Sequence, residues 1–112
     1  MNETSDHERS EYRIVYPLIA RPRLTSAAGS YEVADVSEHG ARLLSKNAKL
    51  PCGTRVSGVL KLAQGRKIDL DGAVVRDFAD GFAVTFDDKS RIPLRWIIAE
   101  QQFLRERYPD WR

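Results

Sequence analysis

Cysteine, histidine and long apolar runs are scarce in this chain of 112 residues, and each absence excludes a class of protein. Cys52 is the single cysteine, so no disulfide can form within the chain and a zinc site built from several cysteines is excluded. No segment approaches the run of about 20 apolar residues that a membrane-spanning helix requires. The first residues, Met-Asn-Glu-Thr-Ser-Asp, are polar and acidic, unlike a secretory signal peptide. We therefore expect a cytoplasmic protein without membrane insertion.

The residues that catalysis usually requires are also few. The histidines are His7 and His39, and neither belongs to a recognisable Ser–His–Asp or Cys–His set. Asp69 and Asp71 alternate on an expected strand, but catalytic carboxylate pairs are usually buried and we expect these two to be exposed. The phosphate-binding loop G-x-x-x-x-G-K-S/T is absent. We expect no enzymatic activity, no catalytic residue, no metal and no cofactor.

The charge of the chain is nearly balanced. Lysine and arginine number 18 and acidic residues 16, which leaves a formal net charge of +2. Proteins that bind nucleic-acid polymers usually carry a larger, clustered positive charge, so we expect no such polymer as a partner. Arginine outnumbers lysine, and its planar guanidinium suits recognition of phosphates and base edges, although genome composition would produce the same bias.

Two short motifs carry side chains that suit a guanine nucleotide. Arg9 and Arg13 form R-x-x-x-R, and residues 35–40 form D-x-S-x-x-G. A guanidinium matches phosphate oxygens and the O6/N7 edge of guanine, while a carboxylate accepts hydrogen bonds from N1–H and N2–H of the same base. Each motif alone has an ordinary interpretation, because Arg91 and Arg95 repeat the arginine spacing and Asp, Ser and Gly are common turn residues. The conjunction of the two motifs favours a binding site.

Alternating apolar and polar residues predict a mainly β fold. Strands are expected over residues 31–36, 41–45, 54–62, 68–74 and 82–86. Residues 14–24 are apolar but contain Pro17 and Pro22, which predicts an edge strand or a bent strand. Short strands separated by turns indicate a small antiparallel β-barrel of about six strands.

The two ends of the chain differ from this pattern. Residues 1–11 are polar and without periodicity, so we expect a flexible N-terminal arm before one domain over residues 12–112. A helical period follows the last strand and predicts a C-terminal helix over residues 91–108, with Ser90 as its cap and Pro93 in its first turn. We expect its apolar face to cover an open end of the barrel or to form an interface; this face comprises Trp96, Ile97, Phe103, Leu104 and Tyr108.

The order of the two motifs and the strands around the second resemble the PilZ domain family, over residues 8–86. The resemblance implies a small β-barrel with a C-terminal helix and a binding site for cyclic di-GMP. It implies that Arg9 and Arg13 clamp phosphates and a guanine edge. Asp35 and Ser37 would hold a guanine, and Gly40 would keep the turn open.

Two further arginines are secondary candidates by the same resemblance. Arg42 follows the second motif and is placed to reach a phosphate, although a surface charge is the simpler interpretation. Arg76 is placed to stack on a base, or to pair with Asp77 or Asp80 instead. Many relatives carry another arginine before the first motif, where this chain has Glu8. That departure bears on whether one or two cyclic di-GMP molecules bind.

The resemblance predicts a receptor that changes conformation on binding cyclic di-GMP and signals to a partner protein in trans, as a monomer or homodimer. Three alternatives remain open. The first is a PilZ-like protein–protein adaptor that does not bind the nucleotide, for example in type IV pilus function or motility. The second is a binder of single-stranded nucleic acid, which the near-neutral charge disfavours. The third is a purely structural role for the arginine-rich face.

Overall fold

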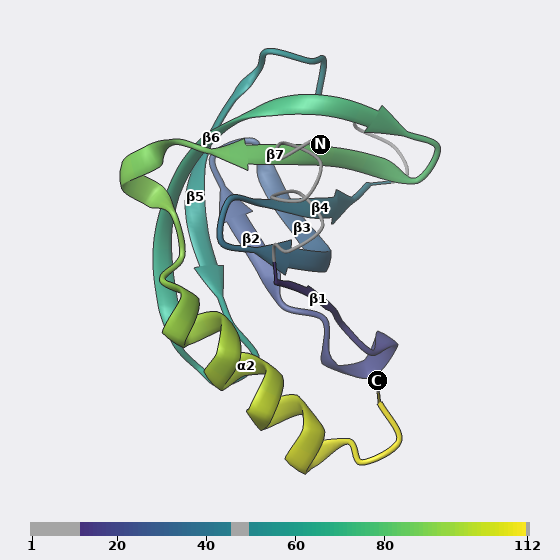
Figure 1. Cartoon of the computed structure of the whole chain (residues 1–112). Helices are drawn as coiled ribbons and strands as arrows, with labels where there is room; N and C mark the ends of the chain where they lie inside the picture. Colours follow the sequence, from purple (N-terminus) through teal and green to yellow (C-terminus); the bar gives the residue numbers. More distant parts are fainter. Residues whose placement is uncertain (1–11, 46–49, 112) are drawn as a thin grey trace, which may run out of the picture.

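The computed structural model describes residues 12–45 and 50–111, so the expected N-terminal arm and Arg9 lie outside the described residues. Antiparallel strands make up most of the fold, and a helix follows the last of them (Figure 1). The elements are β1 (Arg13–Val15), η1 (Leu18–Ala20), β2 (Arg23–Ser26), β3 (Gly29–Ser37), β4 (Gly40–Leu44), β5 (Arg55–Lys61), β6 (Lys67–Phe78), β7 (Gly81–Phe86), η2 (Asp88–Ser90) and α2 (Leu94–Arg107), where η marks a short 3-10 helix.

The strands close into a barrel. They follow the order β3-β2-β5-β6-β7-β4, and β4 pairs back with β3. β1 is an extra strand, which pairs with residues 35–37 of β3, beyond the residues 29–32 that pair with β2. β1 and β2 therefore lie one after the other along the same edge of β3. The prediction of a mainly β chain with a barrel of about six strands is confirmed, with this one addition.

Prolines divide the segment between residues 14 and 24. Pro17 immediately precedes η1, and Pro22 immediately precedes β2. The prediction of one edge or bent strand here is therefore wrong, since a residue without an N–H cannot continue the ladder. Pro22 still contributes its carbonyl, which accepts a 2.9 Å hydrogen bond from the N–H of Val33.

The barrel interior is filled by the apolar residues of the alternating pattern. Tyr31 and Phe82 meet edge to face inside it, with ring centroids 5.4 Å apart. A void among the core residues measures only about 10 Å³, which is too small for a ligand of nucleotide size. The buried residues of the three strands with the clearest alternation are Val56 and Leu60 in β5, Ile68, Leu70 and Val74 in β6, and Phe82, Val84 and Phe86 in β7.

The helix begins three residues later than the sequence predicts. Pro93 is its N-cap residue and Leu94 its first residue, so the prediction of a start at Arg91 with Ser90 as the cap is wrong. The hydroxyl of Ser90 is instead used by the barrel, where it accepts a 3.0 Å hydrogen bond from the N–H of Asp71. Ile97 and Leu104 are completely buried in the core, so this part of the helix face packs against the barrel.

A carboxylate lies on the buried face of this helix. Glu100 is fully buried, and its Oε2 accepts hydrogen bonds from the hydroxyl of Tyr16 (2.6 Å) and the N–H of Ala63 (2.7 Å). Its Oε1 accepts from the N–H and the side-chain amide of Gln64, at 3.1 and 2.9 Å. Burial, reinforced by the charge of Glu100, raises the pKa of Tyr16 far above its ordinary value. One side chain thus ties α2 to the β5–β6 turn and to the residue that follows β1.

Candidate functional site

An open groove on the outer surface of the barrel brings the predicted binding residues together. Its volume is about 580 Å³, within the range of small-molecule sites. Every candidate that lies among the described residues lines it, whereas Arg9 lies outside them. The lining comprises Arg13, Asp35, Ser37, His39, Gly40, Ala41, Arg42, Val75, Arg76, Phe78, Ala83, Val84 and Thr85.

Strand register places four of these residues in one row. Asp35 lies opposite Arg42, Arg42 opposite Ala83, and Ala83 opposite Arg76. Irregular pairing in β3 and in β6, where each strand carries an extra residue, produces this alignment. In β6 the extra residue is Val75, which is exposed beside Arg76. The small side chain of Ala83 lies between the two arginines, so the floor of the groove stays open there.

The two motifs are in direct contact. β1 pairs with the end of β3 so that Arg13 lies opposite Ser37. The guanidinium of Arg13 donates a 2.8 Å hydrogen bond to Oδ1 of Asp35. The Arg13 side chain is 51% exposed, whereas that of Asp35 is only 13% exposed. A half-exposed guanidinium therefore stands beside a nearly buried carboxylate.

The turn of the second motif is held by its own serine and by the backbone. Ser37 is buried; its hydroxyl accepts a 3.3 Å hydrogen bond from the N–H of His39 and donates a 3.5 Å bond to the carbonyl of Gly40. The carbonyl of His39 accepts from Phe86 N–H at 2.7 Å, and that of Glu38 accepts from Ile92 N–H at 3.0 Å. These bonds fix the turn against β7 and the segment before α2.

Gly40 has a different structural role from the one expected. The backbone of Gly40 is not in the left-handed region that favours glycine. A Cβ added to this residue would lie 2.6 Å from the backbone carbonyl oxygen of Val84. The residue is therefore required for the close approach of β4 to β7, which forms the groove floor, rather than for an unusual turn conformation.

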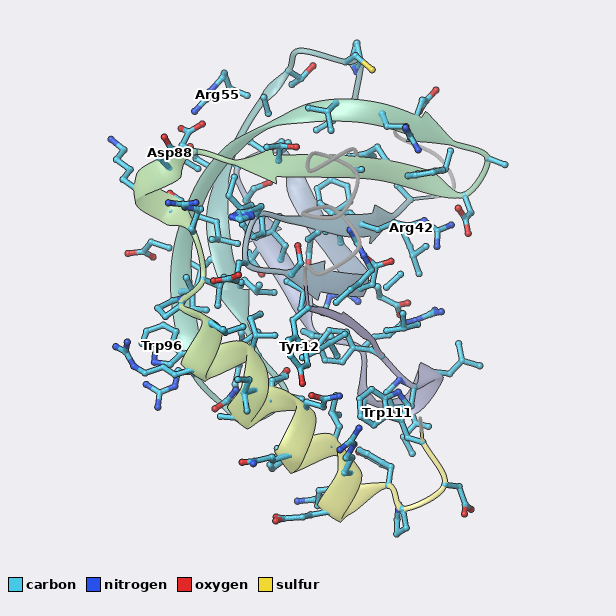
Figure 2. The ribbon with its side chains drawn as sticks, in the orientation of Figure 1. Tyr12, Arg42, Arg55, Asp88, Trp96 and Trp111 are labelled. Atoms are coloured by element: carbon cyan, nitrogen blue, oxygen red, sulfur yellow. The ribbon has the colours of Figure 1, made fainter. Side chains whose placement is uncertain are left out.

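The two secondary candidates flank an aromatic ring. Arg42 lies over the ring of Phe78 at 4.8 Å from its centroid, and Arg76 lies 6.0 Å from the same ring. Arg42 also forms a 2.7 Å ion pair with Asp80, while its Nε is buried without a hydrogen-bond partner. Figure 2 shows Arg42 on the side of the barrel where the turn between β6 and β7 lies. Arg42 is thus ion-paired at the surface of the barrel, and Asp80 pairs with Arg42 rather than with Arg76.

Several lining residues were not predicted from the sequence. The alternation of β7 indicates that Ala83 and Thr85 face outward, but only the register shows that they lie beside the second motif. The sequence does not indicate that Val75 and Phe78 line the groove. Their position depends on the bulge in β6, which shifts the strand register between Val74 and Arg76. In residues 12–45 and 50–111, no group of three His, Cys, Asp or Glu side chains is placed to hold a metal ion.

A scan against models of protein families matches the PilZ domain over residues 7–100. Comparison with curated proteins gives no match. Among the helices of the described residues, none combines the length and apolarity needed to cross a bilayer. The family match covers most of the 112 residues, and the described residues of both motifs share one groove on a closed barrel. The chain therefore belongs to the PilZ domain family, whose members are generally cyclic di-GMP-binding modules rather than enzymes.

Proposed function

We propose that this chain is a cyclic di-GMP receptor without enzymatic activity, and that the nucleotide binds in the groove lined by Arg13 and Asp35. The observation that carries the proposal is the contact between the two motifs, because it places a guanidinium and a carboxylate side by side at one open surface. Family membership supports the same ligand. The groove also suits the ligand in size and in its excess of arginine.

Each side chain has a role that follows from its chemistry. Arg13 donates to a phosphate or to O6 and N7 of a guanine, and Asp35 accepts from N1–H and N2–H. We propose that Arg9 supplies a second guanidinium to the same ligand. Ser37 acts at the guanine through the turn that its hydroxyl holds, and Gly40 acts through the close approach of β4 to β7 that it permits. Arg42, next to Asp35 in the row, and Arg76, at its other end, complete the contacts to phosphate or stack on a base.

Binding requires a rearrangement of the contact between Arg13 and Asp35. The carboxylate of Asp35 accepts a hydrogen bond from the guanidinium of Arg13, so a guanine that approaches Asp35 must share or displace Arg13. A shift of Arg13 moves β1, whose next residues are tied to α2 through Tyr16 and Glu100. We propose that this movement, together with closure of the segment that carries Arg9, presents an altered surface to a partner protein in trans.

Calorimetric titration of cyclic di-GMP into the full chain tests the proposal. We expect saturable binding that GTP does not reproduce. Arg13→Ala and Asp35→Ala should each weaken it by about 10- to 100-fold, since each removes hydrogen bonds to a charged or polar partner. Arg105→Ala, an exposed arginine on α2 outside the groove, is the matched control and should bind as wild type does.

The stoichiometry of the same titration addresses Glu8. One molecule per chain is the expected result, because Glu8 replaces a phosphate partner with a negative charge. Absence of binding by the wild type at high nucleotide concentration, or equal binding by the control and both site variants, would exclude the proposed function.

A further inference from the structure

A second groove lies on a different face of the barrel and shares no lining residue with the first. It has a volume of about 610 Å³ and is bounded by η1, β2, the β5–β6 hairpin and the end of α2. Five of its lining side chains are cationic and none is acidic; the cations are Arg21, Arg23, Lys61, Lys67 and Arg107.

Three of the cations form a row across adjacent strands. Arg23 of β2 lies opposite Lys61 of β5, and Lys61 lies opposite Lys67 of β6. Like charges directly opposite one another on a sheet are destabilising. Both lysines are exposed, and neither forms an ion pair with another residue of the described part of the chain. The arrangement therefore lowers stability unless an anion from outside the chain binds there.

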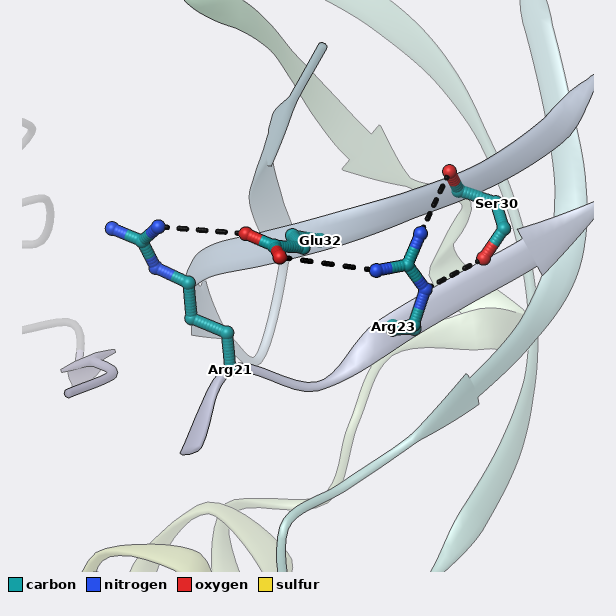
Figure 3. Close-up of polar contacts among 4 residues, drawn as sticks. All are labelled: Arg21, Arg23, Ser30 and Glu32. Carbon is teal, nitrogen blue, oxygen red and sulfur yellow. Dashed lines mark hydrogen bonds and ion pairs between the residues drawn. The ribbon is translucent and has the colours of Figure 1, made fainter. Parts of the chain in front are cut away.

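The arginines of the groove are only partly neutralised. Arg21 and Arg23 approach Glu32 from two sides, with N–O distances of 3.5 and 3.9 Å (Figure 3). Arg23 also donates a 2.9 Å hydrogen bond from Nε to the hydroxyl of Ser30. The Nε of Arg21 is buried and has no acceptor. One half-exposed carboxylate thus serves two guanidinium groups, and the groove keeps a net positive charge.

Aliphatic surface lies between these charges. Ile19 is 78% exposed and Val59 is 39% exposed, and both line the groove. Nucleic acids offer no large aliphatic surface, and they bind through exposed aromatic platforms, whereas Phe103 and Tyr108 are half-buried against the core. A polypeptide can supply carboxylates and aliphatic side chains together. The combination of cations and exposed aliphatics thus favours a peptide over a polyphosphate backbone.

We propose that this second groove, lined by Lys61, Lys67, Ile19 and Val59, binds an acidic segment of a partner protein. Asp or Glu side chains of the segment contact Lys61, Lys67 and Arg107. Its aliphatic side chains cover Ile19 and Val59. The site is small, so the interaction is of the transient class. The proposal rests on the proposed function only in that signalling in trans requires a partner; none of its contacts involves the nucleotide groove.

Selection of short random peptides displayed on phage against the immobilised full chain tests this inference. We expect the selected sequences to be rich in Asp and Glu with interspersed Leu, Ile or Val. Lys61→Glu and Lys67→Glu should each weaken binding of a selected peptide by about tenfold or more. Lys89→Glu is the matched control, because Lys89 is also exposed but lies in η2, outside the groove. The affinity of this variant for the selected peptide should equal that of the wild type.

Other outcomes overturn the inference. These are the absence of enriched peptides, enrichment of peptides without acidic residues, and equal loss of affinity in the Lys89→Glu control. Tight binding of a single-stranded oligonucleotide or of phosphatidylserine vesicles, in the absence of peptide binding, would assign the groove to phosphate instead.

Titrating cyclic di-GMP into the same variants separates this inference from the proposed function. Lys61→Glu and Lys67→Glu should bind the nucleotide as wild type does, and Arg13→Ala should still bind the selected peptide. Either activity can therefore fail while the other is retained.

Discussion

The hydroxyl of Tyr16 donates a 2.6 Å hydrogen bond to the carboxylate of Glu100, which lies 84 residues later in the chain. The first partner directly follows β1, the strand that carries Arg13, and the second is on the buried face of α2. The same carboxylate also accepts from the backbone of the β5–β6 turn. Three parts of the fold that are distant in sequence therefore depend on one buried anion.

Replacing Glu100 by glutamine should destabilise the protein. The amide would turn an NH₂ group toward donors that the carboxylate now accepts from, and buried donors would lose their partner. We expect the free energy of unfolding to fall by about 2–4 kcal/mol, measured by urea denaturation. Glu106→Gln, on the exposed side of the same helix, should change it by less than about 0.5 kcal/mol. Equal effects of the two substitutions would contradict the role assigned to Glu100.

The raised pKa of Tyr16 predicts a loss of stability at alkaline pH. Its ordinary value is 10.0, and burial beside Glu100 keeps the folded phenol protonated above that pH, whereas the unfolded chain releases the proton. The contribution is complete below pH 10 and decreases as the pH rises, by about 1.4 kcal/mol per pH unit. Urea denaturation on both sides of pH 10 should show this slope in wild type and its reduction in Tyr16→Phe. Parallel pH profiles for the two proteins would argue against it.

Ala83 should be sensitive to side-chain size because it lies between Arg42 and Arg76 on the groove floor. Ala83→Leu is expected to weaken cyclic di-GMP binding by about tenfold or more, by filling space that the ligand needs. Ala73→Leu places the same change on a half-buried alanine of β6 that does not line the groove, and it should leave the affinity unaltered. Calorimetry on both variants would show whether the row is the binding surface.

Gly40→Ala should disturb the groove through the backbone. Its Cβ would press on the carbonyl of Val84, so β4 and β7 must separate, with an expected cost of about 1–3 kcal/mol and a loss of nucleotide binding. Gly65→Ala is the comparison, since Gly65 has a φ of +101° but nothing within 4 Å of its Cβ position. That variant should lose about 1 kcal/mol of stability and bind normally. If the loss of nucleotide affinity were proportional to the loss of stability in both variants, Gly40 would have no special role in the groove.

Asp80→Asn should release Arg42 for the ligand. The pair is partly exposed, with side-chain exposures of 34% and 58%, so its loss should cost less than about 1 kcal/mol of stability. Affinity for cyclic di-GMP should rise by about two- to fivefold, because a competing carboxylate is removed. A decrease in affinity would mean that Asp80 orients Arg42 for binding. Isothermal titration together with thermal denaturation distinguishes the two outcomes.

The barrel could be predicted because its strands are locally consistent. Val56 and Leu60, like Leu70 and Val74, recur at even spacing, and this period alone determines which face is buried. The sequence-based predictions are wrong where the local pattern is compatible with more than one structure. Serine is a residue type that often caps helices, which is why the sequence favours Ser90 as the cap. Its hydroxyl instead accepts a hydrogen bond from the backbone N–H of Asp71, and no local sequence signal reveals that partner.

The site was predicted in its composition but not in its geometry. Asp35 and Arg13 were identified from their motifs, and the structure brings them into contact. The placement of Arg42 beside Ala83 depends on strand register, which bulges in β3 and β6 decide. Glu100 was missed altogether, since a charged residue on a helix is expected at the surface and its partners lie 36 to 84 residues away.

The C-terminal end of the chain reaches back to the strand that carries Arg13. The indole N–H of Trp111 donates a 2.7 Å hydrogen bond to the carbonyl of Val15, and Figure 2 shows the ring beside that part of the molecule. Trp96, the other tryptophan, lies on α2 with Arg66 over its ring. In a Trp96→Phe background, the fluorescence of Trp111 becomes an intrinsic optical signal of the position of β1. Nucleotide binding can then be followed in real time without attaching a dye.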